Sequence, residues 1–120
     1  MMELKYFKDE EFRKAQPSCS LSDMEPKLML MLDEAREIAG VPFKINSAFR
    51  SVDYEKSKGR QGTSRHCYGK AVDIACYTSN FRYRIVDALL RVGFKRIGIG
   101  SNFVHCDIGY EGSEPIIWLY

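Results

Sequence analysis

The residues best suited to chemistry in this sequence are an aspartate and the chain's only two histidines. Asp73 stands inside the apolar stretch Ala71–Ala75, where a buried carboxylate costs several kcal/mol unless a cation or hydrogen bonds compensate it. His66 precedes Asp73 by seven residues, and His105 lies in a second apolar stretch, Phe103–Ile108. Taken singly, Asp73 is equally well explained by a solvent-exposed strand face, and His105 by a structural hydrogen bond.

Together, these three side chains form a set that suits a metal ion. Gly69 allows the chain to turn between His66 and Asp73, so that an imidazole on a loop and a carboxylate on a strand can converge. His105 on a neighbouring strand completes a set of two nitrogen ligands and one oxygen ligand. Three protein ligands leave the fourth tetrahedral position to water, which is typical of catalytic rather than structural zinc. The residues therefore predict one zinc ion (Zn2+) per chain.

The elements that must position these residues alternate between helical and extended patterns. Apolar residues recur at helical spacing over residues 28–39, after a capping-box pattern at Ser22 and Glu25, and Ser79 is expected to cap a second helix. Strands are expected at residues 43–46, 70–76, 94–99 and 103–108, with a polar loop of about fifteen residues at 51–65. This order predicts a single α+β domain over residues 1–120, with two main helices and a small, mostly antiparallel sheet.

The composition excludes several classes of protein. Of the 120 residues, 45% are hydrophobic and 12% aromatic, which is too apolar for intrinsic disorder. The 18 basic and 16 acidic residues leave a net charge of +2, too balanced to predict nucleic-acid binding. No apolar run approaches the roughly 18 residues of a membrane span. We therefore expect a soluble protein with no nucleic-acid or membrane partner, whose four cysteines are reduced thiols.

Two of the cysteines directly follow a histidine of the predicted metal set. Cys106 alternates with His105 along a strand, so it is expected to point to the opposite face as a core thiol and not to act as a ligand. Cys67 follows His66 in a loop, where no fixed alternation applies, and its orientation stays open.

Three segments, in this order, resemble one known family. Residues 47–51 read SAFRS, residues 64–74 read SRHCYGKAVDI and residues 103–107 read FVHCD, which fit the patterns S-x-x-R, S-x-H-x-x-G-x-A-x-D and F-V-H-x-D. These patterns are similar to those of the M15 family of zinc D-Ala-D-Ala carboxypeptidases and related endopeptidases, especially the short M15A-type peptidases of bacteria and phages. The resemblance implies the small α+β fold that the family shares with the hedgehog signalling domain, in agreement with the expected elements.

The resemblance also implies roles for individual residues. It implies that the zinc ligands are His66, Asp73 and His105, that Arg50 binds a substrate carboxylate, and that Ser47 and Ser64 border the same cleft. A guanidinium suits the role of Arg50, because its fork of donors matches a carboxylate with two parallel hydrogen bonds. The plainer interpretation of Arg50 is a surface salt bridge.

At the catalytic base, this sequence departs from the better-known family members. Many of them have a carboxylate three residues before the last histidine ligand, or a second histidine two residues before it, whereas these positions hold Asn102 and Phe103 here. Asp107 is the nearest replacement, because strand alternation places it on the same face as the last histidine. Asp107 either takes the proton of the attacking water or orients a histidine ligand. Glu111 and Glu114 are more distant candidates.

These observations predict a zinc-dependent metallopeptidase, either a carboxypeptidase or an endopeptidase. Its expected substrates are D-amino-acid-containing stem peptides of peptidoglycan, and it is expected to act as a monomer. The charged start of the chain lacks a secretory signal, so we expect synthesis in the cytoplasm and delivery to the cell wall by a holin or a secretion system. The alternative is a catalytically inactive zinc-bearing module of the same fold that binds the cell wall or has a structural role, which Asn102 favours.

Overall fold

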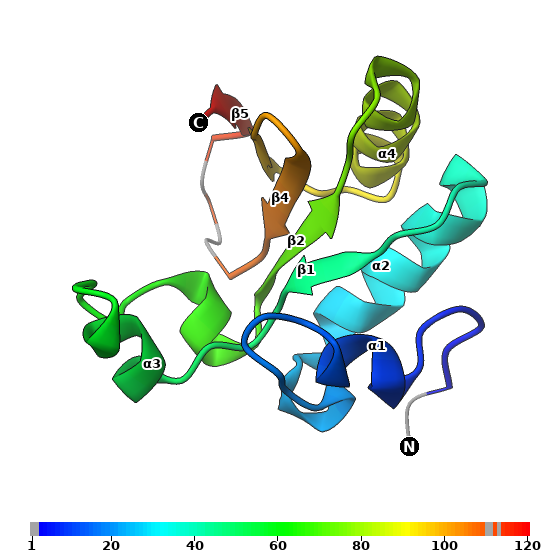
Figure 1. Cartoon of the computed structure of the whole chain (residues 1–120). Helices are drawn as coiled ribbons and strands as arrows, with labels where there is room; N and C mark the ends of the chain where they lie inside the picture. Colours follow the sequence, from blue (N-terminus) through cyan, green and yellow to red (C-terminus); the bar gives the residue numbers. More distant parts are fainter. Residues whose placement is uncertain (1–2, 110–111, 113) are drawn as a thin grey trace.

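The computed structural model describes residues 3–109, 112 and 114–120, which form a five-stranded sheet with helices packed on it (Figure 1). The strands are β1 (Ile45–Ser47), β2 (Ala71–Ala75), β3 (Arg96–Ile99), β4 (Phe103–Asp107) and β5 (Ile116–Leu119). Their order across the sheet is β1-β2-β4-β3-β5, and all neighbours are antiparallel except β3 and β5. The predicted α+β fold with a mostly antiparallel sheet is confirmed.

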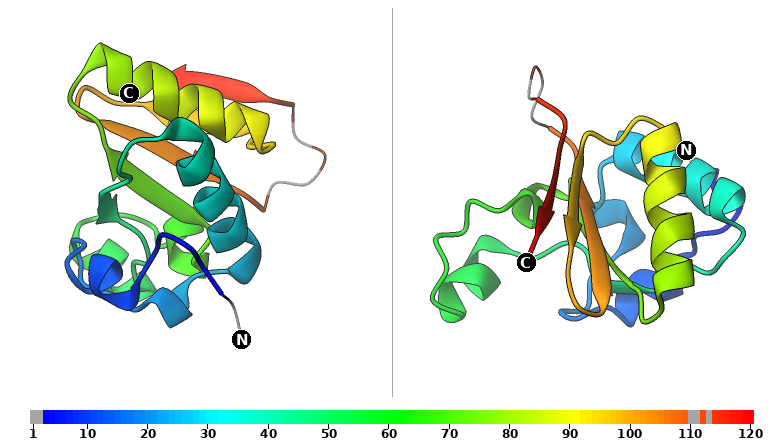
Figure 2. Two further views of the ribbon diagram at one scale, coloured as in Figure 1. Left: turned by 90° about the vertical axis from the view of Figure 1, so that its right-hand side faces the viewer. Right: turned by 90° about the horizontal axis from the view of Figure 1, so that it is seen from above.

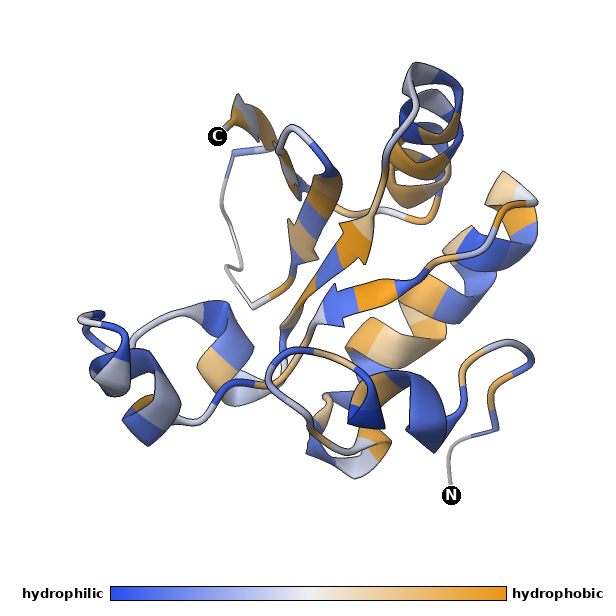
Figure 3. Cartoon of the chain, viewed as in Figure 1, coloured by the Kyte–Doolittle hydropathy of each residue, from blue (hydrophilic) through white to orange (hydrophobic). Residues whose placement is uncertain are grey.

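Two main helices, α2 (Pro26–Ala39) and α4 (Ser79–Arg91), cover one face of the sheet (Figure 2). The apolar stripe of each helix faces the strands, as the hydropathy colouring shows (Figure 3). Fully buried residues of this core are Leu28, Leu32, Ile85 and Leu89 from the helices and Val72, Ile74, Ile97 and Val104 from the strands. A shorter helix, α1 (Asp9–Arg13), packs beside β1. Among the described residues, no helix combines the length and apolar content that a membrane crossing requires.

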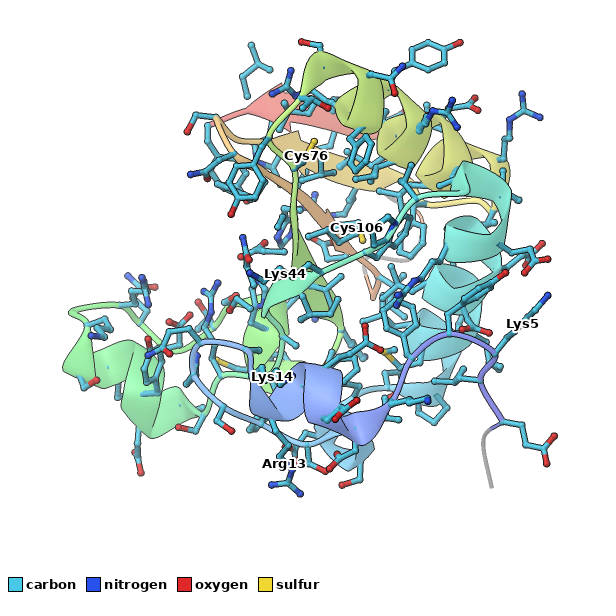
Figure 4. The ribbon with its side chains drawn as sticks, turned by 45° about the vertical axis from the view of Figure 1, so that its right-hand side comes forward. Lys5, Arg13, Lys14, Lys44, Cys76 and Cys106 are labelled. Carbon is cyan, nitrogen blue, oxygen red and sulfur yellow. The ribbon has the colours of Figure 1, made fainter. Side chains whose placement is uncertain are left out.

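Cys106 is fully buried in this core, so the predicted core thiol is confirmed. Figure 4 shows Cys106 among the side chains between the sheet and α2, whereas Lys5 and Arg13 point outward. Strand alternation therefore separates Cys106 from the polar side chains of the same strand, which point to the other face of the sheet.

Side-chain capping differs from the prediction at both main helices, and α2 itself begins after Glu25 without a side-chain cap. Thr78, with an extended backbone, caps α4 by accepting a hydrogen bond from the amide of Phe81, and Ser79 is already helical. The capping box before α2 lies two residues earlier than predicted, at Ser20 and Asp23, around the short 3-10 helix η1 (Leu21–Asp23). A capping side chain works only from a residue whose own backbone is extended, and the sequence alone does not show which of two neighbouring hydroxyl residues is extended.

The long segment 51–65 is only partly a loop. It contains the helix α3 (Val52–Ser57), which Ser51 caps, and it leads into the 3-10 helix η2 (Arg65–Tyr68). The α3 segment lies on the side of the sheet opposite to α2 and α4 (Figure 2, right). The tail forms β5 as an additional edge strand beside β3. The α3 segment and β5 therefore flank the face of the sheet that the two main helices leave uncovered.

Strand register aligns one row of residues across this uncovered face. Ser47 pairs with Asp73, Asp73 with His105, His105 with Gly98, and Gly98 with Trp118. Residues that pair directly across neighbouring strands point to the same face of a sheet. The row therefore places two of the predicted metal ligands side by side, with a serine at one end and a tryptophan at the other.

Gly69 joins η2 to β2 at a close approach between two backbones. Its φ is +68°, and a Cβ at this position would lie 2.2 Å from the carbonyl oxygen of Asp23. We expect Gly69→Ala to lower the free energy of unfolding by about 3 kcal/mol or more, measured by urea unfolding. A left-handed backbone alone costs an L-residue about 1–2 kcal/mol, and the clash with the main chain adds to this cost.

Gly40→Ala is the matched control for this prediction. Gly40 ends α2 with the same φ of +68°, but nothing lies within 4 Å of its Cβ position. Its replacement should therefore cost only the backbone contribution of about 1–2 kcal/mol. Equal losses of stability in the two variants would show that the contact of Gly69 with Asp23 is unimportant.

Candidate metal centre

The structure brings the three predicted metal ligands together. His66 comes from η2, Asp73 from β2 and His105 from the neighbouring strand β4. One ligand atom from each residue lies within 4.8 Å of the other two, and both histidines are buried while Asp73 is partly buried. Two imidazole nitrogens and one carboxylate oxygen are the donors of many catalytic zinc sites, so this group fits zinc.

The ring of His66 is held by the backbone near β1. Its Nδ1 lies 2.7 Å from the carbonyl oxygen of Ala48, and because a carbonyl can only accept, Nδ1 carries the hydrogen. The second ring nitrogen, Nε2, faces the ligand group and lies 3.5 Å from Oδ1 of Asp73. A metal-ligating histidine commonly donates its other N–H in this way, which orients the ring.

The ring of His105 lies between two carboxylates. Its Nδ1 is 2.9 Å from Oδ1 of Asp73, and its Nε2 is 2.7 Å from Oδ2 of Asp107. The other oxygen of Asp107 accepts a hydrogen bond of 2.7 Å from Nε of Arg96. Asp107 therefore contacts the ring nitrogen that points away from the ligand group, and Nδ1 is the atom of His105 that faces a metal.

Protonation in this group follows from its contacts. Burial by itself raises the pKa of Asp73, but hydrogen bonds to His105 and His66 outweigh it and hold the pKa well below the usual 3.8. Burial by itself lowers the pKa of His105, but hydrogen bonds to Asp107 and Asp73 outweigh it and keep the pKa above the usual 6.5. Asp73 is thus ionised as a ligand must be, and a metal at Nδ1 of His105 competes with a proton for this nitrogen.

Arg50 lies directly beside the ligands. Its Nε donates to Oγ of Ser47 at 2.9 Å, and its Nη2 donates to Oδ2 of Asp73 at 3.0 Å. The two oxygens of Asp73 are therefore divided, because Oδ1 faces both histidines while Oδ2 binds the guanidinium. Arg50 and Ser47 were both expected near the site. They are in contact with each other, and Arg50 also contacts the ligand Asp73.

The sequence pattern of the family described as Peptidase M15 matches residues 5–107. The chain belongs to the peptidase M15 family. The matched range contains all three ligands and Arg50, together with the whole sheet except β5. No curated protein matches the chain. The buried ligand group is therefore a candidate metal site in the domain of a peptidase family.

The M15 domain contains a buried carboxylate that the sequence did not reveal. Glu55 in α3 is only 1% exposed, and its Oε1 lies 3.6 Å from Nη1 of Arg50. Its Oε2 lies 2.6 Å from Nη1 of Arg60. Two cations thus compensate the burial of one carboxylate, and Glu55 lies near Nη1 of Arg50 whereas Asp73 binds Nη2. No pattern in the polar segment 51–65 distinguishes Glu55 from its exposed acidic neighbour Asp53.

Ser64 and Cys67 lie on either side of the first histidine ligand in the M15 domain. Ser64 caps η2, and its Oγ accepts a hydrogen bond of 3.2 Å from the amide of His66. Ser64 therefore fixes the start of the turn that carries this ligand. The thiol of Cys67 is half-buried and lies outside the ligand group, and burial raises its pKa.

Two aromatic residues, Trp118 in β5 and Tyr120 directly after it, border the candidate metal centre and were not predicted as site residues. The ring centroid of Trp118 lies 5.5 Å from that of His105, and the centroid of Tyr120 lies 6.4 Å from it. Their alternation with Leu119 along a short extended tail is the signal that could have found them. Both lie beyond residue 107, where the family match ends.

The candidates for the catalytic base are separated by the fold. The contacts of Asp107 with His105 and Arg96 favour the orienting role over that of a base. Asn102 is exposed in the turn between β3 and β4. Glu114 is exposed in the tail, and Glu111 lies outside the described residues.

Proposed function

We propose that this M15 domain is a zinc-dependent peptidase that cleaves D-amino-acid-containing stem peptides of peptidoglycan. The observation that carries the proposal is the buried group of His66, Asp73 and His105 beside the guanidinium of Arg50. In this arrangement the guanidinium of Arg50 can bind the carboxylate of a substrate. The neighbouring metal site can then act on a nearby amide bond of the same molecule. Membership in the M15 family supports the same activity.

The residues of the chain prepare the site for this chemistry. Zinc bound by the three ligands would polarise the scissile carbonyl and lower the pKa of a bound water to about 7. The carbonyl of Ala48 and the carboxylate of Asp107 hold the two imidazoles so that one nitrogen of each faces the ligand group. Orientation of this kind avoids a loss of entropy when metal and substrate bind.

Arg50 retains donors for a substrate carboxylate. A guanidinium has five N–H groups, and three protein acceptors lie near Arg50, namely Ser47, Asp73 and Glu55. Nη1 and Nη2 each therefore keep one N–H that no described residue takes, and these two groups match the two oxygens of a carboxylate. The side chain is 17% exposed, so it is held firmly yet remains accessible.

We further propose that Asp107 orients His105 and is not the catalytic base. Asp107→Asn should weaken zinc binding by about 10–100-fold, because a ligand histidine loses its charged hydrogen-bond partner. Zinc affinity can be measured by competition with a chromogenic chelator, and kcat can be measured with saturating zinc. An orienting role predicts that saturating zinc restores most of kcat.

Ser22→Ala is the control for Asp107→Asn. The hydroxyl of Ser22 lies in the exposed η1 turn and contacts the hydroxyl of Ser20, so its removal should leave zinc binding unchanged. If Asp107→Asn binds zinc as tightly as the wild type but has lost turnover, Asp107 is the base and the orienting role is wrong.

The experiment that tests the proposed function combines metal analysis with product analysis. The purified protein should contain about one zinc per chain and should release new fragments from defined stem peptides, identified by mass spectrometry. Asn102, where many relatives have a carboxylate, favours the alternative of a zinc-bearing module without catalysis. Zinc-loaded protein that leaves all stem peptides intact would support this alternative and overturn the proposed activity.

A further inference from the structure

The row of paired residues across the sheet ends at Trp118 in β5, and Tyr120 follows directly after this strand. The proposed mechanism uses neither aromatic ring. Gly98 in β3 pairs with Trp118, and a Cβ at Gly98 would lie 2.7 Å from the ring of Trp118 and 2.6 Å from the ring of Tyr120. Both rings therefore rest directly on the backbone of β3. Only glycine leaves this space open, and Gly98 is also the register partner of His105.

The two rings continue into a third, and together they form an aromatic surface made of Phe103, Trp118 and Tyr120. Centroid distances are 4.9 Å between Phe103 and Tyr120 and 6.1 Å between Trp118 and Tyr120. Tyr120 is 67% exposed as a residue. Its ring centroid lies 6.4 Å from that of His105, so this ring also lies beside the metal centre. The aromatic surface thus consists of one exposed ring, Tyr120, and two partly buried rings, Trp118 and Phe103, and it lies beside the ligands.

The aromatic surface and Arg50 lie on opposite sides of the metal ligands. Arg50 binds Ser47 in β1, at one end of the row, and Trp118 in β5 is at the other end. A peptide whose carboxylate is bound by Arg50 must therefore extend its amino-terminal part across β3 toward β5. Neighbouring strands are about 4.8 Å apart, so the two steps from β4 to β5 span about 10 Å, the length of about three extended residues.

We propose that the aromatic surface is a subsite for an apolar group of the substrate, two to three residues amino-terminal to the scissile bond. The direction of the peptide rests on the proposed function. The substrate is the expected occupant because the surface begins 5.5 Å from the ring of His105, within reach of any molecule bound at the metal. The rings are already held by β3, so they bury apolar area with little loss of conformational freedom.

Trp118 is the only tryptophan in the chain, so its fluorescence reports directly on this surface. Zinc-loaded protein is titrated with the tripeptide L-Ala-D-Ala-D-Ala, carrying either an N-acetyl or an N-hexanoyl group. We expect the hexanoyl peptide to bind about tenfold more tightly, because its additional methylene groups are buried on the rings. We also expect only the hexanoyl peptide to shift the emission of Trp118 strongly.

Substitutions test which side chains cause the preference for the hexanoyl peptide. The affinity of each variant for both peptides is measured by calorimetry. Trp118→Leu, Tyr120→Leu and Gly98→Ala should each lose most of the tenfold preference, the last because the new Cβ displaces both rings. Tyr120→Phe should keep it. Leu119→Ala is the matched control, because Leu119 is 79% exposed on the same strand but points to the other face. Circular dichroism shows whether each variant is folded. If Trp118→Leu does not fold, Tyr120→Leu alone tests the subsite.

Several outcomes would overturn the subsite: equal affinity of the wild type for both peptides, a preference that survives in the folded leucine variants, or its loss in Tyr120→Phe. Mass spectrometry of the same samples separates this inference from the proposed function. A binding preference without cleavage supports the subsite and contradicts the peptidase activity. Cleavage of both peptides without a preference supports the activity and contradicts the subsite.

Discussion

Replacing His66 by alanine is expected to abolish both zinc binding and peptide cleavage. The variant retains only Asp73 and His105 as ligands of the group, and two protein ligands do not hold zinc as three do. Loss of an outer hydrogen-bond partner alone costs about 10–100-fold in metal affinity, so loss of a ligand should exceed about 1,000-fold. Elemental analysis after dialysis measures the metal, and product analysis measures kcat/KM.

Cys67→Ser is the matched control for this experiment. Cys67 is the next residue in η2, and its thiol lies outside the ligand group. The control should therefore keep about one zinc per chain and wild-type cleavage. Thermal unfolding of both variants checks the fold, since His66 also bonds to the carbonyl of Ala48. A folded His66→Ala protein with wild-type zinc content and activity would exclude His66 as a ligand.

Replacing Arg50 by lysine is expected to raise KM by about 100-fold for peptides with a free carboxylate, with a smaller effect on kcat. Lysine keeps a positive charge near the buried Glu55, so the fold does not have to accommodate an uncompensated carboxylate. It lacks the planar fork, so it cannot make two parallel hydrogen bonds to the substrate. Peptides with an amidated carboxyl terminus should bind equally weakly to wild type and variant.

Arg60→Lys separates substrate binding from support of the fold. Arg60 contacts the same carboxylate, Glu55, at 2.6 Å, but it is half-exposed and does not contact Asp73 in any described interaction. This variant should leave KM unchanged. If Arg50→Lys lowers thermal stability while KM for the free-carboxylate peptide stays at the wild-type value, Arg50 is a structural salt bridge and not a carboxylate clamp.

The candidate metal centre could be predicted from the sequence because polar side chains stand inside apolar stretches. A carboxylate inside the apolar stretch of β2 and a histidine inside that of β4 both require a polar partner, and here they are partners of each other. The two-residue period of a strand also correctly placed Asp107 and His105 on one face, with Cys106 in the core.

Glu55 and β5 could not be predicted in the same way. The helix α3 has six residues and only one that is buried, so it shows no apolar periodicity. The strand β5 pairs in parallel with β3, and therefore depends on a contact with a strand that is not its neighbour in the chain. Local patterns of residues do not determine such pairings.

The amino-acid sequence was sufficient to predict the donor set of the candidate metal centre, two nitrogens and one oxygen, and the two main helices with most of the strands that carry it. The contacts of these groups with one another could be seen only in the folded chain. It divided the oxygens of Asp73 between the histidines and Arg50, placed Asp107 behind His105, and set Trp118 over Gly98. These contacts could not be predicted because they depend on the register between strands. A shift of one residue would turn every side chain of a strand to the opposite face.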